Sequence, residues 1–145
     1  MSTILLPLEK ADQYQGCVLA YGHFSTIHPG HIRYLRHARS LGDQLVVALI
    51  GDGQEEDANP LPFKQQERAE ALSLLGLADA VVLLPGGDLS AAIKKINPTT
   101  LVLGTEFEHK TKIETSVALL REQGGTVQFH AGDVHYASAE LLTSS

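Results

Sequence analysis

The feature that most constrains the fold of this chain is a regular alternation of short apolar segments with segments of helical periodicity. Strands that alternate with helices form βαβ units of a parallel sheet, joined by right-handed crossovers. Near-continuous apolar strands are typical of a sheet that helices cover on both faces. The expected strands are residues 16–21, 44–50, 80–84, 100–103 and 126–130. The expected helices are residues 29–40, 64–75, 88–96 and 112–123.

This pattern predicts a single Rossmann-like, doubly wound, five-stranded parallel sheet with helices on both faces. Residues 1–145 are expected to form one domain, because this length suits one hydrophobic core. Helix ends carry their own signals. Gly42 is expected to be the C-cap of the first helix, while Asp88 or Ser90 caps the third, which Asn97-Pro98 ends.

The composition excludes several classes of protein. Eleven Lys and Arg against seventeen Asp and Glu give a net charge of −6, which argues against a nucleic-acid partner. An anionic ligand must therefore be held by a few placed donors. The single cysteine, Cys17, excludes an internal disulfide and a Cys-rich zinc module, and its apolar surroundings favour inert burial. With neither a signal peptide nor a membrane-length apolar segment, we expect a cytoplasmic protein without a membrane partner.

Two loops are placed to bind a ligand. In a doubly wound sheet, ligands lie beyond the carboxyl ends of the strands, where the strand order reverses. The first expected strand runs into residues 21–31, and the fourth runs into residues 104–108. If these two strands are neighbours, both loops line one crevice.

His28-Pro29-Gly30-His31, in the first of these loops, opens a helix. The N-terminus of a helix favours an anion, Gly30 allows close approach to the backbone, and Pro29 fits the first turn. This predicts a phosphate site with two imidazole donors, His28 and His31. Two alternatives stay open: histidines that only cap and pack, and a zinc site, which needs a third and usually a fourth ligand.

Gly22-x-Phe24 followed by His28-x-Gly30-His31 resembles the signature of the cytidylyltransferase-like nucleotidyltransferases. That family includes glycerol-3-phosphate cytidylyltransferase and the adenylyltransferase domain that makes ADP-heptose. The similarity continues through Asp52 and Glu67-Arg68 and ends near Glu106-Phe107, so it spans most of the chain.

The resemblance implies that an acceptor phosphate attacks the α-phosphorus of CTP or ATP and that pyrophosphate leaves, with Mg²⁺ bridging the phosphates. The resemblance does not identify which protein residues would bind the metal. His28 and His31 would be the catalytic residues, and Lys64 and Arg68 would bind phosphate of the substrate. The residues expected to bind the nucleotide are Tyr21, Gly22, His23, Phe24, Gly30, Gly104, Glu106 and Ser138.

The sequence departs from the family pattern mainly on the acceptor side. Ser25 and Leu103 stand where many relatives have Asp and Lys, and residues 52–60 hold four acids and no base. Relatives usually carry a Ser/Thr-rich turn after the fifth strand, and in this chain Ser138 is the one residue that clearly matches it. We therefore carry two functions: transfer of CMP or AMP to a phosphorylated sugar or polyol, and a catalytically weak or silent nucleotide-binding regulatory module. By resemblance, the chain could form a homodimer or belong to a longer protein with a fused sugar-kinase domain.

Overall fold

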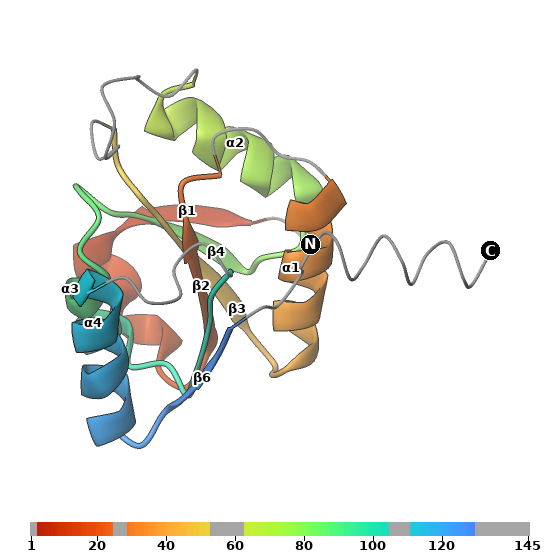
Figure 1. Cartoon of the computed structure of the whole chain (residues 1–145). Helices are drawn as coiled ribbons and strands as arrows, with labels where there is room; N and C mark the ends of the chain where they lie inside the picture. The colour runs from red at the N-terminus through yellow and green to blue at the C-terminus, as the bar shows by residue number, and fades with distance from the viewer. Residues whose placement is uncertain (1–2, 25–28, 53–62, 105–110, 130–145) are drawn as a thin grey trace.

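The computed structural model describes residues 3–24, 29–52, 63–104 and 111–129 (Figure 1). In this part of the chain, six parallel strands form one sheet in the order β1-β4-β3-β2-β5-β6. The strands are β1 (Ile4–Pro7), β2 (Val18–Gly22), β3 (Leu45–Leu49), β4 (Ala80–Leu83), β5 (Thr100–Val102) and β6 (Thr126–Gln128). The helices are the 3₁₀ helix η1 (Leu8–Tyr14) and the α-helices α1 (Pro29–Ser40), α2 (Gln65–Leu75), α3 (Leu89–Ile96) and α4 (Thr111–Glu122).

The helices cover both faces of the sheet, as the predicted doubly wound fold requires. Helices α1 and α2 pack on one face, and η1, α3 and α4 pack on the other (Figure 1). The side chains of β2 show the alternation: Val18 and Ala20 face α1, whereas Leu19 and Tyr21 face α3. The predicted Rossmann-like fold is therefore confirmed. Within the described residues, no helix has the length and apolar character needed to cross a membrane.

The prediction of five strands was one too few. The additional strand, β1, has four residues, ends in Pro7 and pairs with β4 at the edge of the sheet. So short a segment lacks a readable period, and proline normally argues against a strand. At an edge, however, the missing N–H costs no ladder hydrogen bond. The sequence reading also missed η1, which connects β1 to β2.

Gly42 is needed for a different reason from the one predicted. It does not adopt the left-handed conformation of a C-cap, which Gly76 does adopt after α2 with a φ of 66°. Instead, a Cβ at Gly42 would lie 2.9 Å from Cγ2 of Val18. The residue therefore allows close approach between the end of α1 and β2. The predicted cap of α3 is confirmed, because Asp88 Oδ1 accepts a hydrogen bond from the N–H of Ala91 at 3.1 Å.

The sheet divides at the carboxyl end of β2. Pairing of β2 with β3 continues to Gly22 and Leu49, whereas pairing of β2 with β5 stops at Ala20 and Val102. Beyond this point β2 and β5 are no longer paired. Since strand order reverses here, this is the switch point at which doubly wound sheets bind ligands.

Candidate active site

The two predicted loops start from β2 and β5, the neighbouring strands on either side of the switch point. The first leaves β2 through Gly22, His23 and Phe24 and enters α1 at Pro29, and the second leaves β5 through Leu103 and Gly104. Three residues predicted for this site, His28, Glu106 and Ser138, lie outside the described residues. The expectation that both loops belong to neighbouring strands is confirmed.

The N-terminus of α1 follows the loop that leaves β2 at this switch point. Pro29 is the first helical residue and is exposed, Gly30 is buried, and His31 is partly buried. Proline suits this position because its missing N–H would have no acceptor within the helix. The first turn of a helix presents its N–H groups and the positive end of its dipole, which together favour a phosphate.

Phe24 connects the loop after β2 to His31 of α1. It has a φ of 50°, which turns its ring back over Gly22, where a Cβ would lie 3.1 Å from the ring. The ring centroid is 5.3 Å from that of His31, at an interplanar angle of 54°, and 6.1 Å from that of Tyr34, nearly parallel to it. Gly22 and Phe24 therefore form a packing unit that orients His31. That they contact a nucleotide stays a prediction.

Tyr21 joins β2 to the connection between β4 and α3. Its side chain is buried, and its hydroxyl donates a hydrogen bond to the carbonyl of Gly87 at 2.5 Å. Burial raises the pKa of Tyr21 to about 12, and the nearby Asp88 charge adds to this, so the hydroxyl stays a neutral donor. The structure thus gives Tyr21 a hydrogen bond to the protein, and its predicted contact with nucleotide stays a prediction.

Arg68 lies inside the protein, where it joins three segments. Its exposed fraction is 2%. Its guanidinium donates to the carbonyls of His23 (2.6 Å), Ile50 (2.9 Å) and Phe63 (3.0 Å) and to Oδ1 of Asp52 (2.9 Å). Four of its five N–H groups thus bind protein oxygens. Arg68 thus ties the loop after β2 to the end of β3. Its predicted contact with phosphate stays a prediction.

Asp52 and Lys64 flank the start of α2. Oδ1 of Asp52 accepts from the backbone N–H of Gln65 at 2.8 Å as well as from Arg68, so Asp52 stabilises the helix N-terminus. Lys64 precedes the helix, and its side chain is exposed. No role for Asp52 was predicted from the sequence, although it contacts Arg68 directly. The signal was an acid in the connection after β3 together with an arginine in the first turn of the following helix.

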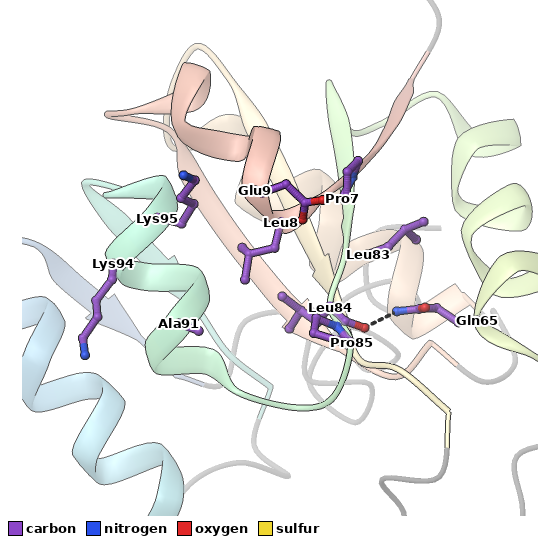
Figure 2. Close-up of a pocket in the computed structure, with 10 residues that line it drawn as sticks. All are labelled: Pro7, Leu8, Glu9, Gln65, Leu83, Leu84, Pro85, Ala91, Lys94 and Lys95. Carbon is purple, nitrogen blue, oxygen red and sulfur yellow. Dashed lines mark hydrogen bonds between the residues drawn. The ribbon is translucent and has the colours of Figure 1, made fainter.

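A separate cavity of about 640 Å³ lies at the carboxyl ends of β1 and β4, between η1, α3 and the start of α2 (Figure 2). Its lining includes Leu8, Leu83, Pro85 and Lys94, and the side chain of Gln65 donates there to the carbonyl of Leu84 at 2.7 Å. None of the residues predicted to bind substrate lines it. The cavity therefore lies apart from the switch point, because β3 separates β4 from β2 in the sheet.

Among the described residues, no group of three or more His, Cys, Asp or Glu side chains is arranged to hold a metal ion. Cys17 is buried, and burial raises its pKa to about 12, so the thiolate is strongly disfavoured. The prediction that this cysteine is buried is confirmed.

A doubly wound parallel sheet with a glycine-containing helix N-terminus at its switch point is typical of nucleotide-binding α/β domains. Comparison with known proteins makes this class more specific. The chain belongs to the cytidylyltransferase-like family of nucleotidyltransferases, whose model matches residues 19–138.

Named relatives agree with this assignment. The bifunctional protein HldE of Methylococcus capsulatus is 36% identical over 132 residues, covering 86% of this chain and 26% of that protein. The FAD synthase of Methanococcoides burtonii is 39% identical over 88 residues, covering 60% of this chain and 61% of that protein. The chain therefore spans about a quarter and about three fifths of these two relatives.

A solved structure agrees as well. The lipopolysaccharide core biosynthesis protein from Thermoplasma volcanium superposes with a TM-score of 0.64 at 28% identity, covering 79% of this chain and 93% of that one.

Proposed function

We propose that this protein transfers AMP or CMP from ATP or CTP to the phosphate of a small phosphorylated sugar or polyol. An oxygen of the acceptor phosphate attacks the α-phosphorus, the bond between the α-phosphorus and the bridging oxygen breaks, and pyrophosphate leaves with the electron pair. The observation that carries the proposal is the start of α1, with Gly30 and His31, at the point where β2 and β5 separate.

The two histidines would stabilise the charge that moves during transfer. His28 and His31 donate hydrogen bonds to phosphate oxygens as negative charge builds on the leaving pyrophosphate. The N-terminus of α1 adds its dipole, and Gly30 allows the phosphates to approach the backbone. No covalent intermediate with the protein is needed, so positioning and charge stabilisation supply the catalysis.

The remaining predicted contacts surround these phosphates. We assign His23, Gly104, Glu106 and Ser138 to the nucleotide, with Tyr21, Gly22 and Phe24 shaping its site. Lys64, exposed at the start of α2, is the candidate contact for a substrate phosphate. For Arg68, the four hydrogen bonds to protein favour a role in holding the loops over a direct contact.

Mg²⁺ would neutralise phosphate charge when bound to the triphosphate. The described residues offer it no cluster of three ligands, and Asp52 already accepts from Arg68 and Gln65. These residues fit a metal held mainly by oxygens of the nucleotide phosphates.

The relatives support a phosphorylated polyol as acceptor. FAD forms when AMP from ATP is joined to the phosphate of flavin mononucleotide, and that phosphate stands on a ribityl chain. A relative named FAD synthase therefore favours ATP and an acceptor of this class. We propose that residues 1–145 act as one domain. Because the chain matches one part of a bifunctional protein, we also propose fusion to a sugar kinase. A homodimer, expected from the family resemblance, is a further proposal.

A second function is favoured by the lack of positive charge on the acceptor side: residues 52–60 hold four acids and no base, and Leu103 stands where many relatives have Lys. In that case the protein is a regulatory module that binds nucleotide without turnover.

Pyrophosphate release separates the two functions. The protein is incubated with Mg²⁺ and ATP or CTP, without acceptor or with glycerol 3-phosphate, a sugar 1-phosphate or flavin mononucleotide. The proposed transfer predicts release that needs both the triphosphate and one of these acceptors. Tight binding of a non-hydrolysable triphosphate without turnover on any acceptor would instead support the regulatory module.

A further inference from the structure

The hydroxyl of Tyr34 lies between the ends of β2 and β5. It accepts a hydrogen bond from the backbone N–H of Tyr21 at 3.2 Å and donates one to the carbonyl of Val102 at 2.5 Å. Tyr34 is on α1, one turn after His31, and its side chain is buried. One side-chain oxygen thus bridges backbone groups of two neighbouring strands.

These two backbone groups would otherwise pair with each other. Val18 and Gly22 make their backbone hydrogen bonds toward β3, so Tyr21, at the alternate position, faces β5. Leu103 donates to Gln128 on the β6 side, so Val102 faces β2. In a regular parallel ladder the N–H of Tyr21 would donate directly to the carbonyl of Val102. The Tyr34 hydroxyl is therefore inserted into the ladder, at the place where pairing of β2 with β5 stops.

The ring of Tyr34 packs against Phe24, in the loop after β2. It lies nearly parallel to the ring of Phe24, with centroids 6.1 Å apart, and Phe24 contacts His31. The same residue thus spaces the two strand ends and supports the aromatic ring that packs against His31.

We propose that Tyr34 is a positioning residue that sets the opening between β2 and β5 and thereby the reacting geometry at the start of α1. This inference rests on the proposed nucleotidyl transfer. Without the hydroxyl, the N–H of Tyr21 and the carbonyl of Val102 pair directly, and the strand ends approach each other. His31 and the residues after β5 then no longer match the spacing of the reacting phosphates. Displacements of about 1 Å can lower rates by about 10²-fold.

The test is Tyr34→Phe, which removes only the hydroxyl and keeps the ring against Phe24. We expect turnover at saturating substrates to fall by about tenfold or more, with the Kd of a non-hydrolysable triphosphate changed less than about threefold. The backbone amide signals of Tyr21 and Gly104 in NMR spectra should shift. The matched control is Tyr14→Phe, which alters a buried tyrosine of η1 that packs in the core. It should leave turnover and both amide signals unchanged.

Wild-type turnover and unshifted amide signals in Tyr34→Phe would overturn the inference. Equal losses of turnover and melting temperature in both variants would also overturn it, since they would indicate general packing. If Tyr34→Phe does not fold, NMR of the wild-type protein tests the inference instead. A slowly exchanging Tyr34 hydroxyl proton, with a nuclear Overhauser contact to the Tyr21 amide, is expected, and its absence would refute the insertion. Should the wild type release no pyrophosphate, the proposed function fails, while the amide shifts still decide the role of Tyr34.

Discussion

Nη2 of Arg68 lies 2.9 Å from Oδ1 of Asp52, in an ion pair whose cation is buried and whose anion is half exposed. The pair closes a set of hydrogen bonds in which Arg68 also binds the carbonyls of His23, Ile50 and Phe63. A buried guanidinium needs such partners, because leaving it unpaired away from water is costly. Arg68 therefore holds the start of the active-site loop against the end of β3.

Arg68→Lys should lower the free energy of unfolding by about 2–3 kcal/mol, because lysine keeps the charge but cannot reach several acceptors at once. Urea unfolding measures this loss. Asp52→Asn, which keeps an acceptor oxygen and leaves the three carbonyl contacts of Arg68 in place, is the control and should cost less than Arg68→Lys. Equal losses in the two variants would show that the ion pair, rather than the three carbonyl contacts, carries the stabilisation.

Gly22→Ala should disturb the active-site loop, because the new Cβ would lie 3.1 Å from the Phe24 ring. We expect a loss of about 1–2 kcal/mol in unfolding free energy together with lower turnover, since Phe24 must move relative to His31. The control is Gly42→Ala, whose Cβ would lie 2.9 Å from Val18 at the other end of β2. It should be destabilising without reducing turnover of the folded fraction. A stable Gly22→Ala variant with normal turnover would refute the packing role of Phe24.

Stability should fall in alkaline solution because Cys17 must ionise on unfolding. Its pKa is raised from 9.0 to about 12 in the folded protein. The raised value favours the neutral thiol, so the associated stability is present below pH 9 and is lost as the pH rises toward 12. Between pH 9.5 and 10.5, wild type should lose about 1 kcal/mol more than Cys17→Ala. Urea titrations at several pH values measure the difference. Parallel pH profiles would contradict it.

Much of the fold could be predicted from the sequence because its signals are local. The period of α1, the Asp88 cap and the apolar runs of β2 to β4 follow from neighbouring residues. The short edge strand β1 could not be predicted in this way, because four residues ending in Pro7 carry no period.

The site was predicted in outline for the same reason. The sequence pattern marked the loop and helix that carry Gly30 and His31, but the contacts between distant segments were missed. Arg68 was expected to bind a substrate phosphate, and its hydrogen bonds to His23 and Ile50 were not foreseen. Tyr34 was not singled out at all. The partner of the Tyr34 hydroxyl, Val102, is 68 residues away, so nothing near Tyr34 in the sequence indicates the contact.

The most direct test of the central claim is pyrophosphate release by His31→Ala, compared with its affinity for a non-hydrolysable triphosphate. The matched control is His37→Ala, on the same helix, whose ring pairs with Oε1 of Gln128 at 3.0 Å. If His31 stabilises charge during transfer, turnover falls by about 10²–10³-fold, while affinity changes far less and His37→Ala behaves as wild type. Wild-type turnover in a folded His31→Ala protein would contradict the account.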